Sequence, residues 1–196
     1  VDAVTGLPSS ETAGFGTPQA ITTSYLWNTT WRKPTSIVRP GLSTAITYTT
    51  GGDPQTITLT DTTTQTVPYS TANQQRVYTF VWGANGLLTS RDGPLPGTAD
   101  QISYTYDALG NLATITDEIG LVTTINQVDA MGRPLQITEA SGRVSTFSYT
   151  PRGWLDEIIV NPGGSQRLTS FTYDETGNLT RIDAPGSRWT EYEYDN

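Results

Sequence analysis

The residues of this sequence best suited to chemistry are carboxylates that stand beside glycines. Asp107, Asp129 and Asp174 each lie three residues before a glycine, and Asp195 occupies the same position in a further copy of the pattern. A repeated carboxylate in a glycine turn can bind Ca²⁺, but that ion takes ~6–8 oxygen ligands and each turn offers one carboxylate. An Asp side chain can also cap a turn, by accepting a hydrogen bond from the backbone two residues further on. We therefore predict turn caps, with no metal and no other cofactor.

Two adjacent carboxylate pairs could suggest glycoside hydrolysis: Asp117 with Glu118, and Asp156 with Glu157. That chemistry needs two carboxylates roughly 5–10 Å apart across one cleft. Neighbours along a strand point to opposite faces of the sheet. The pairs are therefore predicted to be solvated turn or edge charges.

Nucleophilic catalysis also lacks its partners. Ser and Thr are abundant, but the chain has no His to act as their base and no Cys to form a thiolate or a disulfide. Lys33, beside Pro34, is predicted to be a solvated edge residue. We expect no enzymatic activity.

The tryptophans allow two interpretations. Their rings could stack on sugars from an exposed sheet face, or they could pack between neighbouring hairpins, as aromatic side chains commonly do. An exposed cluster of at least two tryptophan rings on one face would favour glycan binding, and burial of all five would weaken that hypothesis. The residues are Trp27, Trp31, Trp82, Trp154 and Trp189.

All these residues belong to a chain that repeats itself. Copies of one pattern start at residues 106, 128, 149, 173 and 194, which lie 21 to 24 residues apart, and such a period indicates a stacked repeat architecture. The shared positions are Tyr106, Asp107, Gly110, Leu112, Ile115 and Gly120; Val128, Asp129, Gly132, Ile137 and Gly142; Tyr149, Gly153, Ile158 and Gly164; Tyr173, Asp174, Gly177, Ile182 and Gly186; and Tyr194 and Asp195.

Each copy is typical of a β-hairpin. Its Asp-x-x-Gly segment predicts a tight turn, because Gly readily takes a positive φ. Aromatic pairs such as Tyr104 and Tyr106 lie two residues apart, hence on one face, where stacked copies would form a ladder. Leu112 and Ile115 are three apart, which predicts a bulge or a sharp twist. Single hairpins are marginally stable, so the copies must pair edge to edge.

Composition supports an all-β fold. Thr and Tyr are frequent, helix formers are rare, and no apolar stripe has helical spacing. We predict antiparallel hairpins that form one continuous curved or spiralling sheet. Regular repeats cover 101–196, degenerate repeats cover 21–100 with loop excursions at 61–73 and 92–100, and 1–20 is a degenerate repeat or a loop-rich lead-in.

The charge balance limits the partners. A net charge of −8 leaves no basic face for nucleic acid. No apolar run is long enough to span a bilayer, and the chain does not start with a signal peptide.

The motif Tyr-x-Tyr-Asp-x-x-Gly-Asn-Leu-x-x-Ile, followed by a glycine and a Thr-rich return strand, resembles the YD repeat of the RHS (rearrangement hotspot) family. Clear copies cover 101–196. The resemblance implies a β-ribbon that spirals into a hollow shell, as in bacterial polymorphic toxins, the cocoons of insecticidal toxin complexes and, distantly, teneurins. It also implies a secreted or cell-surface location. The implied partners are the rest of the array and a C-terminal toxin or effector, which a built-in aspartyl protease releases.

The chain departs from that family pattern in two ways. It lacks the Asp-Pro-x-Gly-Leu cleavage motif, since Asp53-Pro54 is followed by Gln55, and it has no effector-like domain. We therefore expect a piece of a longer array, with open sheet edges that can self-associate. The leading hypothesis is a structural segment of a cargo-enclosing shell, and the alternative is a module that binds glycans or a cell surface.

Overall fold

The computed structural model describes residues 1–161 and 165–195, and Gly164 lies outside them. The described residues form strands and turns without a helix, which confirms the all-β prediction. Accordingly, no helix among them has the length and apolar character needed to cross a membrane.

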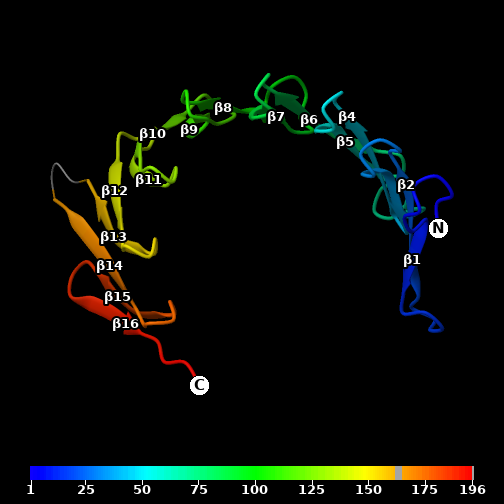
Figure 1. The fold of residues 1–196 in the computed structure, drawn as a ribbon. Coiled ribbons are helices and arrows are strands. Elements are labelled where there is room, and N and C mark those ends of the chain that lie inside the picture. Colours follow the sequence, from blue (N-terminus) through cyan, green and yellow to red (C-terminus); the bar gives the residue numbers. More distant parts are fainter. Residues whose placement is uncertain (162–164, 196) are drawn as a thin grey trace. The chain divides into compact units, whose positions relative to one another are not determined.

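The strands pair antiparallel with their sequence neighbours in one open sheet, in the order β1 to β16. The chain divides into two compact units, residues 1–103 and 104–196. Figure 1 shows the hairpins of each unit following one another in chain order. The first unit holds β1 (Ser10–Ala13), β2 (Ile21–Trp27), β3 (Pro34–Arg39), β4 (Leu42–Tyr48), β5 (Pro54–Asp61), β6 (Gln75–Trp82), β7 (Leu88–Asp92) and the start of β8 (Ile102–Tyr106). The second continues with β9 (Leu112–Thr116), β10 (Val122–Val128), β11 (Pro134–Thr138), β12 (Val144–Tyr149), β13 (Leu155–Val160), β14 (Arg167–Tyr173), β15 (Leu179–Ala184) and β16 (Arg188–Glu191).

A bulge recurs where a strand leaves its turn. On β12, Ser148 and Tyr149 are consecutive, but their partners on β13 are Glu157 and Leu155, so one residue of β13 is extra. Ile158 then pairs with Phe147, two residues before Tyr149. Leu155 and Ile158 therefore reach the same face although they are three residues apart. The bulge predicted from that spacing is confirmed in this copy.

The two faces of the sheet differ. Phe171 and Tyr173 are half-buried, whereas Thr172 between them is exposed, and Tyr104, Thr105 and Tyr106 alternate in the same way. No apolar side chain among the described residues is fully buried. The sheet within each unit is thus a single layer without a closed core, and contacts between neighbouring hairpins must stabilise it.

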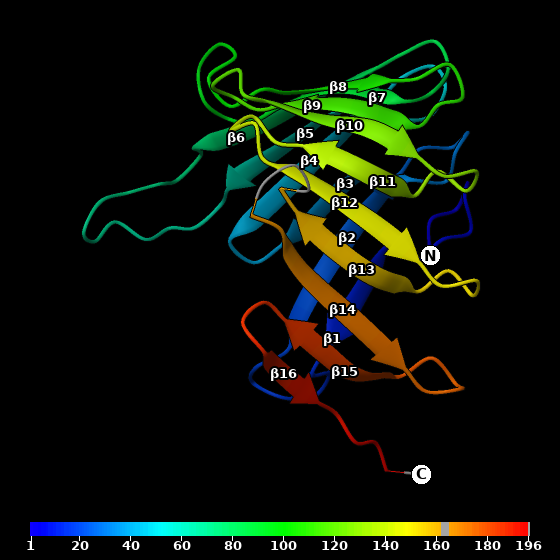
Figure 2. The same ribbon diagram turned by 90° about the vertical axis from the view of Figure 1, so that its left-hand side faces the viewer.

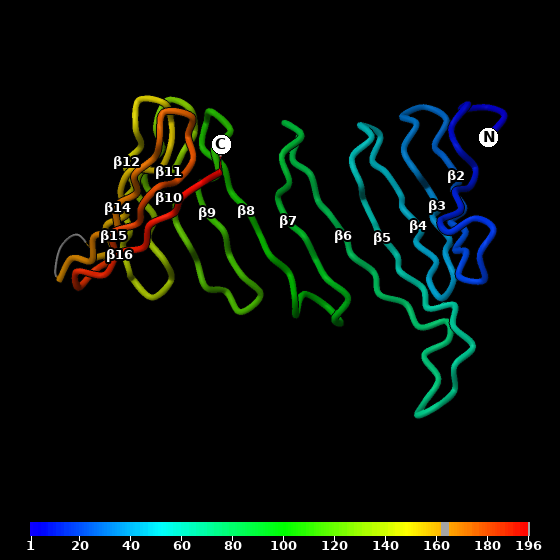
Figure 3. Tube along the Cα trace, turned by 90° about the horizontal axis from the view of Figure 1, so that it is seen from below, coloured from blue at the N-terminus to red at the C-terminus, as the bar shows by residue number. Residues whose placement is uncertain are grey.

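Two long loops interrupt the hairpins of the first unit, at 62–74 and 93–101. Figures 2 and 3 show the loop between β5 and β6 projecting beyond the neighbouring turns. Asp61 holds its base, because its carboxylate accepts hydrogen bonds from the Thr63 N–H (2.7 Å) and the Thr71 hydroxyl (2.5 Å). The backbone N–H of Asn73 also donates to the Asp61 carbonyl.

Candidate functional site

In each unit, one end of the hairpins carries a series of turns, most of which contain a glycine. In each turn, the N–H of the first residue donates to the carbonyl of the last, four or five residues on. We call these the repeat turns: 2–7, 28–33, 49–53, 83–87, 107–111, 129–133, 150–154 and 174–178. The most N-terminal of them has one residue more than the copy at 129–133, and its Gly6 has the positive φ that Gly132 also has.

The aspartates that begin repeat turns act as caps. The Asp107 carboxylate accepts hydrogen bonds from the N–H groups of Leu109 (2.9 Å) and Asn111 (2.8 Å). Asp174 does the same for Thr176 and Asn178 (both 2.9 Å), and hydrogen bonds from those two side chains and N–H groups lower the pKa of Asp174 to about 2. The carboxylate oxygens thus serve the turns.

A second kind of hydrogen bond joins consecutive repeats. The aromatic residue directly before one repeat turn donates, from its hydroxyl or indole N–H, to the carbonyl of the residue directly after the preceding repeat turn. We call each such pair of positions a joint. The bonds are Trp27–Pro8 (2.8 Å), Tyr48–Pro34 (2.7 Å), Trp82–Pro54 (2.7 Å), Tyr149–Pro134 (3.0 Å), Tyr173–Leu155 (2.9 Å) and Tyr194–Leu179 (2.9 Å).

The sequence contained a signal for the joints that ring stacking alone does not explain. Between residues 27 and 194, every position directly before a repeat turn is Tyr or Trp except Val128. The position two residues earlier also accepts Phe, as in Phe147 and Phe171. Only Tyr and Trp carry a polar donor on the ring. The need for a ring donor directly before the repeat turn, but not two residues earlier, would have predicted the hydrogen bond of the joint.

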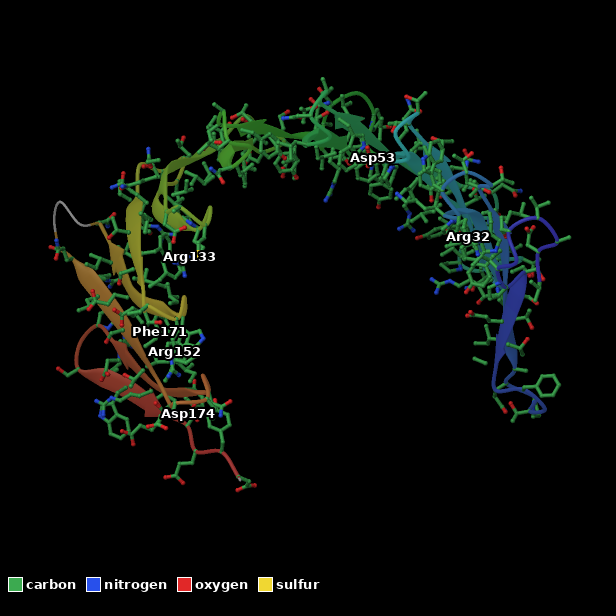
Figure 4. All side chains as sticks on the ribbon, in the orientation of Figure 1. Arg32, Asp53, Arg133, Arg152, Phe171 and Asp174 are labelled. Carbon is green, nitrogen blue, oxygen red and sulfur yellow. The ribbon has the colours of Figure 1, made fainter. Side chains whose placement is uncertain are left out.

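From several repeat turns, a side chain also contacts the glycine of the next repeat turn. A Cβ built on Gly177 would lie 2.7 Å from the Trp154 ring, and one on Gly153 would lie 2.8 Å from the Arg133 guanidinium. Arg133 additionally lies 4.3 Å from the centre of the Tyr149 ring and pairs with Asp129 at 2.6 Å. Figure 4 shows Arg133, Arg152 and Asp174 following one another along one side of the second unit's ribbon.

Lys33 contributes to a joint of the first unit. Its ammonium donates to the Gly52 carbonyl at 2.7 Å and lies 5.9 Å from the centre of the Tyr48 ring. The prediction of a merely solvated edge residue was therefore incomplete. Trp31 contacts the same glycine, with its ring 2.7 Å from the place of a Cβ on Gly52.

Most tryptophan rings are engaged within the array. Trp27 and Trp82 donate joint hydrogen bonds, while Trp31 and Trp154 cover glycines. Trp189 is the exception, being 57% exposed and 5.1 Å from the Arg181 guanidinium. A cluster of two exposed tryptophan rings, which would favour glycan binding, is not found among the described residues, and glycan binding stays a prediction.

Trp154 also lines an open aromatic groove of about 460 Å³ in the second unit, together with Phe171, Tyr173 and Asp156. Tyr173 tilts against the Trp154 ring at 5.2 Å between centroids. Burial, and then the charge of Asp156, raise the pKa of Tyr173. The rings in this groove thus contact one another and the next turn.

The other carboxylates considered for chemistry are dispersed. Asp117 caps the opposite turn by accepting from the N–H groups of Ile119 (3.1 Å) and Leu121 (2.8 Å). Asp156 and Glu157 are consecutive residues of β13. In the part of the chain that the structure describes, no three Asp or Glu side chains converge as a metal site would require.

Comparisons with known proteins match this architecture. A family model described as Teneurin YD-shell matches residues 59–196. Among solved structures, the crystal structure of TcdB2-TccC3-Cdc42 matches 86% of this chain with a TM-score of 0.62 and 14% sequence identity. The Tc holotoxin pore of Photorhabdus luminescens matches 83% with a TM-score of 0.37 and 15% identity. A search of curated proteins finds no match.

The chain spans only 9% and 11% of those two solved chains. At such identity the first likeness shows the fold alone, and the second scores too low to add to it. The family model covers most of this chain, including the regular repeats and their turns. With its hairpins paired in sequence order, the chain belongs to the teneurin YD-shell family and has the structural role of shell wall.

Proposed function

We propose that this wall segment helps to enclose a toxin or effector cargo and contributes no catalytic step of its own. Its immediate partners are further repeats of the same array, and the assembled shell works outside the cell that makes it. The absence of a closed core within each unit suits a wall, because a wall must be continuous rather than compact.

The observation that carries the proposal is the series of joints. Each is made by a residue before one turn and a residue after the previous turn, as in Tyr48–Pro34 and Tyr173–Leu155, so these bonds fasten hairpins to their neighbours. Nearest-neighbour coupling of this kind is how repeat proteins extend without a central core. The likeness to the TcdB2-TccC3-Cdc42 structure supports the same architecture.

Protease protection tests enclosure. In a protein that joins this chain to the rest of its array and its C-terminal segment, we expect that segment to resist protease while the shell is intact. Gly177→Ala, which forces the Trp154 contact apart, should expose it, and Gly120→Ala, with open space around the new Cβ, is the matched control. Cleavage of the segment as fast in the intact protein as in isolation would rule out enclosure.

A further inference from the structure

The joint between β9 and β10 differs from the others. Val128 stands directly before the repeat turn 129–133, where the other copies between residues 27 and 194 place Tyr or Trp. Its side chain has no donor for the carbonyl of Leu112, the residue directly after the preceding repeat turn. The hydrogen bond that Tyr149 makes to Pro134 therefore has no equivalent from Val128.

The same joint also lacks a ring contact or a cation. In the next joint along the chain, the Arg133 guanidinium covers the Tyr149 ring at 4.3 Å. At the position of Arg133, the earlier repeat turn has Asn111, whose amide oxygen reaches Gly132. A neutral amide and an aliphatic side chain can supply neither a cation–π interaction nor aromatic packing.

Strand register supplies a second, independent observation. Between Ile125 and Val128, the pairing of β10 with β11 shifts twice, at Ile125/Gln127 and again at Gln127/Val128. The other pairings of the second unit with a shift have one, as between Ser148 and Tyr149. The end of β10 next to the joint is thus irregular in its pairing with β11.

We propose that the β9–β10 joint is a seam, the joint at which the second unit opens first. Local opening occurs where the fewest contacts resist it. The β11–β12 pair has three paired residues, as β9–β10 does, so the two differ mainly in what their joints contain. The seam gives the wall a defined position at which strands separate locally. This inference does not depend on whether a cargo is enclosed.

Hydrogen exchange on the full chain, read by mass spectrometry, tests the seam. We expect faster exchange in 112–116 and 122–128 than in 134–138 and 144–149. Val128→Tyr, which restores the donor, should slow exchange at the seam by about fivefold, the effect of one typical hydrogen bond. Val128→Phe is the matched control, because it adds the ring without the hydroxyl.

A reciprocal variant keeps the test decisive if Val128→Tyr does not fold. Tyr149→Phe removes only the hydroxyl from an intact joint and should raise exchange in β11–β12 toward that of the seam. Equal protection of the two strand pairs in the unmodified chain would overturn the proposal. Equal effects of Val128→Tyr and Val128→Phe, or no change with Tyr149→Phe, would overturn the role assigned to the hydroxyl.

Discussion

The hydroxyl of Tyr173 donates a 2.9 Å hydrogen bond to the carbonyl of Leu155, which lies 18 residues earlier on the neighbouring strand. This bond ties the start of one strand to the end of the next. It gives the tyrosine of each repeat a role that ring packing alone would not require.

Removing that hydroxyl should weaken the sheet. Tyr173→Phe is expected to lower the free energy of unfolding by about 1 kcal/mol, the usual contribution of one hydrogen bond, as measured by urea denaturation. Tyr104→Phe is the control, because this position accepts Phe in the copies at Phe147 and Phe171. Equal losses from the two variants would show that the Leu155 bond contributes nothing.

Alanine substitutions at two glycines can distinguish the cost of backbone strain from the cost of steric crowding. Gly177 and Gly120 both have positive φ, 97° and 82°, but a Cβ meets the Trp154 ring only at Gly177. Gly120→Ala should cost about 1 kcal/mol from the left-handed backbone. Gly177→Ala should cost about 3 kcal/mol, because overpacking is added. Equal unfolding midpoints for the two variants, in heat and in urea, would contradict the close contact at Gly177.

The loss of stability on replacing a tryptophan should depend on whether its ring is packed or exposed. Trp154→Ala removes a ring packed on Gly177 and Tyr173 and should cost about 2 kcal/mol, less than for a fully buried ring. Trp189→Ala should change stability by less than about 1 kcal/mol, because Trp189 is exposed. Urea denaturation of both variants measures the difference. A larger loss at Trp189 would reverse this assignment.

Acid should loosen the repeat turns. The folded pKa of Asp174 is lowered to about 2, below the ~3.9 of an unfolded aspartate. The stabilisation from its carboxylate is therefore present above pH ~4 and is lost as the pH falls through the folded value. Asp174→Asn can still cap the turn but cannot titrate, so it should lose less stability than the unmodified chain between about pH 6 and about pH 2. If the urea midpoints of the variant and the unmodified chain fell equally as the pH is lowered, Asp174 would play no part in the acid sensitivity.

Much of the fold could be predicted because local chemistry repeats. The Asp-x-x-Gly spacing indicated the turns, and the Leu-to-Ile spacing indicated the bulge seen between Leu155 and Ile158. The joints could not be predicted from alternation, which assigns Tyr173 to a face but not to a partner. The contact of Trp154 with Gly177 depends on how two successive turns are placed, and a single repeat does not contain that information.

The single-layer sheet has an evolutionary consequence. In a globular domain, adding or removing twenty residues disturbs a shared interior, but in this chain each hairpin depends on its two neighbours. A tandem duplication that preserves the spacing between the donor Tyr and the acceptor carbonyl of a joint leaves the flanking hairpins intact. Genes for such proteins can therefore lengthen or shorten by whole copies, and the length of the wall can change without redesign of any part.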